Sequence, residues 1–296
     1  MTAGRRLPPW LRRPLAHPGD YRVVDGLLDE LHLSTVCQEA RCPNRGECFA
    51  GGTATFLVAG DACTRGCRFC AVETREPAPL DPTEPTRVAE AVKRLGLRHA
   101  VVTMVTRDDL ADGGAAHVAA VIEAIRSAVP GAAVEVLVSD LGGDERAVDC
   151  VVDAGPGVFN HNLETVPRLY PEVRPGADYS RSLRLLARAK ERRPEMPTKS
   201  GLMLGLGETR DEIIAVMRDL RAVGCDLITL GQYLRPSPAH LPVVEFVEPG
   251  AFTMLARESR KMGFSGVASA PLVRSSYHAS ELVAGVGGAS DQETID

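Results

Sequence analysis

Three cysteines, Cys63, Cys67 and Cys70, lie within eight residues and have the spacing Cys-x3-Cys-x2-Cys. Three thiolates this close together could bind three corners of an iron–sulfur cluster, which normally takes four cysteine ligands. The segment contains no fourth cysteine, so one iron would keep the open position that catalysis requires. A zinc site completed by a distant ligand is the alternative, although zinc loops favour paired Cys-x2-Cys hairpins.

A second triplet, Cys37, Cys42 and Cys48, has the spacing Cys-x4-Cys-x5-Cys and also lacks a fourth cysteine nearby. Two such triplets so close in sequence are improbable as structural thiols, and they predict two metal centres. Cys150 and Cys225 stand alone in apolar surroundings, and we expect both to be small buried core residues.

Length and composition describe an ordinary globular chain of 296 residues, with 44% apolar residues and a net charge of −5. This charge gives no indication of a general nucleic-acid binder. No apolar run approaches the roughly 18 residues of a membrane helix, and no secretory signal is evident. We therefore expect a cytoplasmic protein with no membrane partner, in a compartment where thiols stay reduced.

Short apolar, β-branched runs alternate with helical patterns through most of the chain. Such alternation predicts βαβ units and a parallel sheet. The expected strands are 53–59, 100–105, 134–139, 158–160, 201–204 and 227–230. The expected helices are 23–31, 86–95, 115–129, 144–153, 180–192 and 210–223.

Six strands are too few to close an eight-stranded barrel. We therefore expect an α/β fold, a partial (β/α)6 TIM-like barrel whose open face is covered by N- and C-terminal extensions. The predicted segments are an extension with the first cysteine triplet (1–52), the partial barrel (53–250) and a C-terminal extension (251–296). The polar motifs follow the strands, so they should meet at the carboxyl edge of the sheet, where such folds place their chemistry.

The triplet Cys63, Cys67 and Cys70 has Phe69 before its last cysteine and follows the first barrel strand. In both respects and in its spacing it resembles the motif of the radical S-adenosylmethionine (SAM) superfamily. That resemblance implies a 4Fe–4S cluster whose open iron binds SAM. One electron from the cluster then cleaves SAM to a 5′-deoxyadenosyl radical that abstracts hydrogen from unactivated carbon.

The triplet Cys37, Cys42 and Cys48 is similar to the auxiliary-cluster motif of the lipoyl synthase family, and the similarity runs from about Val23 to Ala279. It extends to the segments 106–114, 160–166, 199–208, 231–237 and 274–279, the last of which reads Arg-Ser-Ser-Tyr-His-Ala. Each segment alone is weak evidence for the similarity, but together with both triplets the segments are specific to this family.

This second resemblance implies insertion of two sulfur atoms, at C6 and C8 of an octanoyl group on a carrier-protein lysine. The sulfur comes from the auxiliary 4Fe–4S cluster, which is consumed. The implied partners are octanoylated carriers (the glycine cleavage H protein and the lipoyl domains of 2-oxoacid dehydrogenase acyltransferases), a ferredoxin or flavodoxin reductant, and an iron–sulfur carrier that renews the cluster.

The resemblance also implies roles for particular residues. Ser276, with Ser275 as the fallback, would be the fourth ligand of the auxiliary cluster, and a hard oxygen ligand suits a cluster that must come apart. The residues expected to contact SAM are Asn162, Glu164, Arg174, Gly205, Glu208 and Tyr233. Asp108 and Asp109 are expected to have structural or cofactor-positioning roles rather than to act as an acid–base pair.

Two other classes of function stay open at this point. One is a different auxiliary-cluster radical enzyme that acts on another acyl or peptide substrate. The other is a non-catalytic iron–sulfur or zinc scaffold, which would have no need of SAM-binding motifs at the strand ends.

Overall fold

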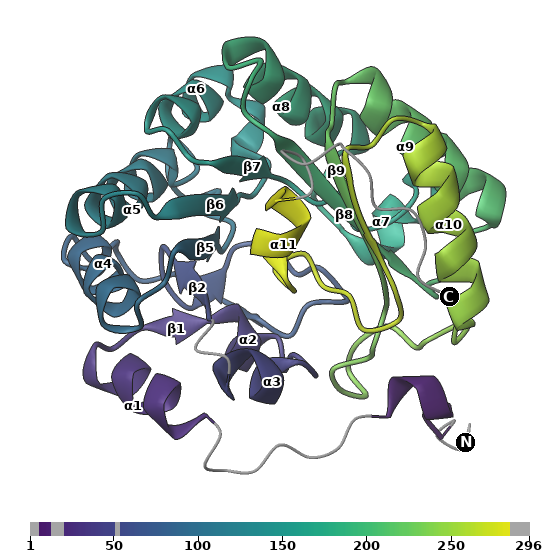
Figure 1. Ribbon diagram of the computed structural model, residues 1–296, viewed down its shortest axis with the longest axis horizontal. Coiled ribbons are helices and arrows are strands. Elements are labelled where there is room, and N and C mark those ends of the chain that lie inside the picture. The colour runs from purple at the N-terminus through teal and green to yellow at the C-terminus, as the bar shows by residue number, and fades with distance from the viewer. Residues whose placement is uncertain (1–5, 13–20, 51–53, 285–296) are drawn as a thin grey trace.

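An eight-stranded sheet forms the centre of the protein in the computed structural model, which describes residues 6–12, 21–50 and 54–284 (Figure 1). Its strand order is β1-β2-β5-β6-β7-β8-β9-β10. All neighbouring strands from β2 to β10 are parallel, and β1 pairs with β2 in the antiparallel direction at one edge. The sheet curves into an open, partial barrel, as the sequence predicts.

The strands of this sheet are short and buried. Their bounds are β1 (Ser34–Thr35), β2 (Thr55–Val58), β5 (His99–Met104), β6 (Ala133–Leu137), β7 (Val158–Asn160), β8 (Thr198–Leu204), β9 (Leu227–Gln232) and β10 (Gly266–Ser269). The strand expected to begin at Thr53 is observed from Thr55, and Thr53 itself lies outside the described residues.

Helices lie on the outer face of this curved sheet (Figure 1). The long ones are α1 (Arg22–Glu30), α4 (Glu84–Arg94), α5 (Ala115–Ala128), α6 (Glu145–Asp153), α8 (Tyr179–Arg192), α9 (Arg210–Ala222) and α10 (Pro249–Lys261). Each has a set of buried apolar residues along one side, which is the pattern of an amphipathic helix packed against a core. Thr209 and Glu212 form a capping box that fixes where α9 begins.

The shorter elements surround the open face of the barrel. They comprise η1 (Pro9–Leu11), α2 (Val36–Glu39), α3 (Arg45–Ala50), the two-stranded ribbon of β3 (Ala62–Cys63) and β4 (Glu73–Thr74), η2 (Leu141–Gly143), η3 (Pro167–Leu169), α7 (Tyr170–Val173) and α11 (Ala279–Ala284). In Figure 1, α2 and α3 lie beside β2, and α11 lies in front of the sheet.

Several features differ from the sequence expectations, and one is the long helix α10, which matches none of the predicted helices. The sheet has a further parallel strand, β10, which pairs with β9 from within the predicted C-terminal extension. The segment 32–52, expected to be loop-like, contains α2 and α3. Cys225 is buried as predicted, but the prediction for Cys150 is wrong, because it lies on the exposed side of α6, opposite the buried Val148 and Val151.

A buried ion pair crosses the interior of the barrel. Lys199 Nζ on β8 donates to Glu135 Oε1 on β6 at 2.8 Å, and both side chains are fully buried. Asn160 Nδ2 donates to the same oxygen at 3.2 Å, and His99 Nε2 lies 3.5 Å from Glu135 Oε2. Burial opposes ionisation of Glu135, yet Lys199 and His99 hold the pKa of its carboxyl below the usual value. Charges in such a position are stable only when they are paired.

Candidate functional site

A single cavity of about 450 Å³ opens at the carboxyl edge of the sheet and contains residues of both cysteine triplets in its lining. Its size is typical of sites for cofactors and small ligands. The predicted site residues in its lining are Cys37, Cys42, Cys48, Cys63, Cys67, Cys70, Asn162, Glu164, Arg174, Tyr233, Ser275 and Ser276. Residues up to 239 positions apart in sequence (37 to 276) are therefore brought to one site.

The loop that carries Cys63, Cys67 and Cys70 is fixed by backbone hydrogen bonds to three other segments. Thr64 N donates to Thr106 O at 3.1 Å, beyond the end of β5. Arg68 N donates to Val173 O at 3.0 Å, and His240 Nε2 lies 2.9 Å from Cys70 O. Because these contacts need no metal, the fold itself presents the three thiols to the cavity.

Two thiols of this loop, those of Cys67 and Cys70, are buried enough to change their acidity. Burial raises the pKa of the Cys67 thiol and raises that of Cys70 to about 12. In the other triplet, burial raises the pKa of Cys37 to about 11. Since iron and zinc bind the thiolate, metal binding at either triplet would release protons.

The loop of Cys37, Cys42 and Cys48 is built by short helices and local hydrogen bonds. Thr35 caps α2, with its Oγ1 accepting from Gln38 N at 3.3 Å. Cys42 N then donates to Cys37 O at 3.1 Å, so the chain turns back on itself between the two thiols.

The segment around Ser275 and Ser276 is joined by hydrogen bonds to the loop of Cys37, Cys42 and Cys48. Asn44 Nδ2 donates to Leu272 O at 2.7 Å, across 228 residues of sequence. Tyr277 Oη donates to Glu47 Oε1 at 2.7 Å. These contacts involve sequence neighbours of Ser276 and Cys48, and Ser276 lines the same cavity as the triplet.

Asn162, Glu164 and Arg174 form a polar wall on the side of the Cys63–Cys70 loop. Asn162 Nδ2 donates to Glu164 Oε1 at 3.0 Å, and Arg174 Nη1 donates to Asn162 O at 2.9 Å. Glu164 has a φ of +67°, a conformation that costs free energy for a residue other than glycine and that often marks functional sites. Burial raises the pKa of its carboxyl, although Arg174 opposes that shift.

Two polar atoms of this wall, Asn162 Oδ1 and Arg174 Nε, are buried without a hydrogen-bond partner among the described residues. Unpaired buried polar atoms are uncommon in folded proteins and call for an explanation. One is an acceptor and the other a cationic donor, so they match the ammonium and carboxylate groups of an amino acid. SAM carries both groups on its methionine part.

The remaining predicted SAM contacts lie differently. Gly205 and Glu208 are not among the residues that line the cavity in the described ranges. Glu208 Oε2 instead accepts from Leu206 N at 2.9 Å, and its Oε1 accepts from Gly205 N, so this carboxylate caps a turn. Tyr233 borders the cavity, but its hydroxyl donates to Leu241 O at 2.9 Å and only 1% of the residue is exposed.

Two glycines outside the predicted set of SAM contacts also shape the cavity. A Cβ on Gly201 would lie 2.6 Å from Thr229 Oγ1 and 2.9 Å from Asn162 Oδ1. At Gly231, a Cβ would lie 2.1 Å from Val273 O. Both positions therefore need glycine if the polar wall and the C-terminal segment are to pack as they do.

The three thiols of each triplet are the groups available in this cavity to hold a metal centre. Among the residues described, no three His, Cys, Asp or Glu side chains converge closely enough to hold one ion. A cubane cluster distributes its thiolates over separate irons and so takes ligands that stand further apart. The donor set of three sulfur ligands per loop agrees with iron–sulfur chemistry.

Comparison with known proteins defines the class to which this fold and site belong. The model of the radical SAM superfamily matches residues 57–220, which include the Cys63–Cys70 loop and most of the barrel. The chain belongs to this superfamily, which implies SAM and a 4Fe–4S cluster as cofactors.

Full-length relatives narrow the assignment. The lipoyl synthase of Caldanaerobacter subterraneus subsp. tengcongensis is 57% identical over 93% of this chain and 96% of its own length. The lipoyl synthase of Methylococcus capsulatus is 56% identical over 95% of this chain and 88% of its own length. That of Thermus thermophilus is 53% identical over 94% of this chain and 87% of its own length. The chain is a member of the lipoyl synthase family.

Solved structures agree on the fold. Methylornithine synthase (PylB) superposes with a TM-score of 0.54 at 18% identity, over 80% of this chain and 73% of that chain. The FeFe-hydrogenase maturase HydG from Carboxydothermus hydrogenoformans superposes with a TM-score of 0.58 at 18% identity, over 78% of this chain and 56% of that chain.

None of the helices described here is both long enough and apolar enough to cross a membrane.

Proposed function

We propose that this protein inserts two sulfur atoms, at C6 and C8 of an octanoyl group bound to a carrier-protein lysine, and so forms the lipoyl group. The observation that carries the proposal is the shared cavity. Both cysteine triplets, the Ser275–Ser276 segment and the Asn162–Arg174 wall line it together. A radical made at one triplet would then lie within one enclosed space with a sulfur source at the other.

In this proposal Cys63, Cys67 and Cys70 bind the cluster that binds SAM. That cluster, when present and reduced, cleaves SAM and supplies the radical that abstracts hydrogen from the octanoyl chain. Arg174 would bind the methionine carboxylate through its unpaired Nε, and Asn162 Oδ1 with Glu164 would bind the ammonium group. The three side chains thereby orient the bond that breaks.

Cys37, Cys42, Cys48 and Ser276 would hold the auxiliary cluster, which is a substrate because it gives up its sulfur. The contacts from Asn44 to Leu272 O and from Tyr277 to Glu47 join the segment of this serine to the cysteine loop, which supports this assignment. Ser275 is already bonded to Asn162, at 2.6 Å, which favours Ser276 as the ligand. The apolar part of the cavity lining, with Val36, Leu137 and Met203 among its residues, suits an octanoyl chain.

The partners in this proposal follow from the reaction. The substrate is an octanoylated carrier, such as the glycine cleavage H protein or a 2-oxoacid dehydrogenase lipoyl domain. A ferredoxin or flavodoxin would supply electrons, and an iron–sulfur carrier would rebuild the auxiliary cluster after each turnover.

Metal analysis and product analysis test the proposal together. Anaerobic reconstitution with iron and sulfide should give about eight irons per chain, as expected for two cubane clusters. Incubation with dithionite, SAM and an octanoylated carrier peptide should then give 5′-deoxyadenosine and a lipoyl peptide. One zinc per chain would contradict the assignment of the clusters. Formation of 5′-deoxyadenosine without sulfur transfer would favour a radical enzyme with a different substrate.

A further inference from the structure

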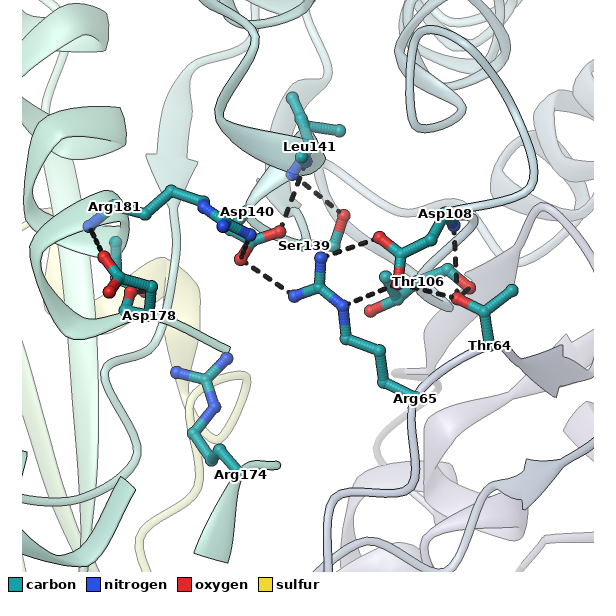
Figure 2. Close-up of polar contacts among 12 residues, drawn as sticks. Thr64, Arg65, Thr106, Asp108, Ser139, Asp140, Leu141, Arg174, Asp178 and Arg181 are labelled. Carbon is teal, nitrogen blue, oxygen red and sulfur yellow. Dashed lines mark hydrogen bonds and ion pairs between the residues drawn. The ribbon is translucent and has the colours of Figure 1, made fainter. Parts of the chain in front are cut away.

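Arg65 lies between Cys63 and Cys67 in the loop, and its guanidinium is held by two carboxylates from other strands (Figure 2). Nε and Nη2 donate to the two oxygens of Asp108, each at 2.7 Å. Nη1 donates to Asp140 Oδ2 at 2.8 Å. Asp108 follows β5 and Asp140 follows β6, so one side chain joins the loop to two neighbouring strand ends.

This arrangement is more buried than an ordinary surface ion pair. The Arg65 side chain is 10% exposed, and that of Asp140 is 1% exposed. Arg181 Nη1 lies 3.3 Å from the same Asp140 oxygen, and Gly142 N donates to Asp140 Oδ1 at 3.3 Å. Two arginines thus balance two carboxylates, and the bidentate pair fixes an orientation as well as a distance.

The same residue contacts a predicted cluster ligand through its backbone. Arg65 N donates to Cys63 Sγ at 3.4 Å. On the other side of the pair, Thr64 Oγ1 lies 3.2 Å from Asp108 Oδ2 and accepts from Asp108 N at 3.1 Å. Two consecutive loop residues are therefore fixed to the Asp108 turn, and the N–H of the second one points at sulfur.

All three guanidinium nitrogens of Arg65 donate to Asp108 or Asp140, so three of its five N–H groups are committed to these carboxylates. Arg174 stands apart from this network in Figure 2 and keeps an unpaired Nε. Arg174 and Arg65 therefore differ in role. Arg174 is available to a ligand, whereas Arg65 acts on the loop.

We propose that Arg65 is a positioning residue whose pairing with Asp108 and Asp140 holds the Cys63–Cys70 loop in its cluster-binding shape and keeps the Arg65 N–H directed at Cys63 Sγ. Hydrogen bonds to cluster sulfurs stabilise the reduced, more negative cluster and so help to set its reduction potential. Partners outside the ligand set also fix ligand geometry, and their loss commonly costs 10- to 100-fold in metal affinity. The inference rests on the proposed assignment of Cys63, Cys67 and Cys70 to the SAM-binding cluster.

The test compares Arg65→Lys, Arg65→Gln and Asp108→Asn in the reconstituted holoprotein. Arg65→Lys keeps the positive charge but loses the planar guanidinium that pairs with both oxygens of Asp108. Its effect therefore reports geometry rather than charge. Arg75→Gln is the matched control, because Arg75 also pairs with two carboxylates, Asp61 and Glu73, but is 40% exposed and follows the loop. The readouts are the rate of iron loss to a chelator and the midpoint potential of the cluster whose electron paramagnetic resonance signal changes on addition of SAM.

We expect Arg65→Gln to lose iron from that cluster about 10- to 100-fold faster than the unchanged protein. Arg65→Lys should lower the midpoint potential although the charge is kept. Asp108→Asn should accelerate iron loss, and adding it to Arg65→Gln should have little further effect, as expected for partners in one contact. Asp108→Asn also covers the case in which Arg65→Gln does not fold, because Asp108 is 40% exposed and the change is isosteric.

Unchanged iron loss and unchanged potential in Arg65→Lys and Asp108→Asn would overturn the inference. The same changes in Arg75→Gln would overturn it too, because they would show a general effect of lost surface charge. A cluster signal in the unchanged protein that does not respond to SAM would instead contradict the proposed cluster assignment, so the two failures are distinguishable.

Discussion

Asn162 Nδ2 donates a hydrogen bond to Ser275 Oγ at 2.6 Å, and thereby joins the end of β7 to the C-terminal segment 113 residues later. Asn162 belongs to the wall proposed to bind SAM, and Ser275 precedes the proposed auxiliary ligand Ser276. The two halves of the site are therefore in direct contact, and Ser275 has a hydrogen-bond partner on the SAM side of the cavity.

This contact predicts different outcomes for the two serines. Ser276→Ala should abolish sulfur insertion while SAM cleavage continues, because only the auxiliary cluster loses a ligand. Ser275→Ala should keep sulfur insertion but weaken SAM binding about fivefold, which corresponds to one hydrogen bond of about 1 kcal/mol. SAM affinity by calorimetry and product by mass spectrometry distinguish the two. The reverse pattern would make Ser275 the ligand.

The two cysteine triplets should divide the reaction between them. Cys42→Ala should still form 5′-deoxyadenosine from SAM but make no lipoyl product, whereas Cys67→Ala should do neither. Chromatography of the nucleoside and mass spectrometry of the peptide measure the two steps in the same sample. Equal loss of SAM cleavage in both variants would contradict this division.

Arg174 should account for a large part of the affinity for SAM. Arg174→Gln removes a buried cationic donor whose Nε is unpaired, and charge-assisted hydrogen bonds contribute about 1.5–3 kcal/mol, so SAM affinity should fall about 10- to 100-fold. Arg168→Gln is the control. Arg168 lies just before the short helix α7, which Arg174 follows, but it pairs with Glu212 on the exposed surface. Equilibrium binding of SAM to both variants measures this difference. Equal affinities would show that Arg174 does not bind SAM.

The buried pair of Glu135 and Lys199 should contribute to stability in a pH-dependent way. The folded-state pKa of Glu135 lies below its ordinary value of 4.5, so its contribution is complete above that pH and is lost as the pH falls through the folded pKa. Glu135→Gln should therefore lower the free energy of unfolding by about 3–5 kcal/mol at neutral pH, because the Lys199 charge is left unpaired.

Urea unfolding between neutral and acidic pH measures this contribution. The difference between Glu135→Gln and the unchanged protein should shrink as the pH falls. Glu191→Gln is the control, since Glu191 is exposed and lies 3.9 Å from its arginine partner. A difference that stays constant with pH would show that the charge of Glu135 does not stabilise the fold.

Much of the barrel could be predicted from sequence because its signals are local. Buried strands such as β5 and amphipathic helices such as α8 have strong periodicity, and each is observed close to its predicted bounds. Strand β10 was missed because it has four residues, of which only Gly266 is fully buried, so it lacks an apolar run. It forms because β9 offers an edge to pair with.

The site could be predicted from the sequence only where residue types and their spacing indicate the chemistry directly. Cysteine spacing is such a signal, and both triplets line the cavity. The role of Arg65 has no local signal, because its partners Asp108 and Asp140 come from other strand ends. Conversely, Glu208 has the residue type of a ligand-binding acid, but the structure uses it to cap the turn at Gly205 and Leu206.

The origin of the inserted sulfur is the most direct test of the account. The protein is reconstituted with heavy-isotope sulfide, freed of excess sulfide, and allowed one turnover with unlabelled SAM, reductant and octanoylated carrier peptide. We predict that both sulfur atoms of the lipoyl product carry the heavy isotope and that the auxiliary cluster is lost. A product with unlabelled sulfur, or 5′-deoxyadenosine formed with no sulfur in the peptide, would contradict it.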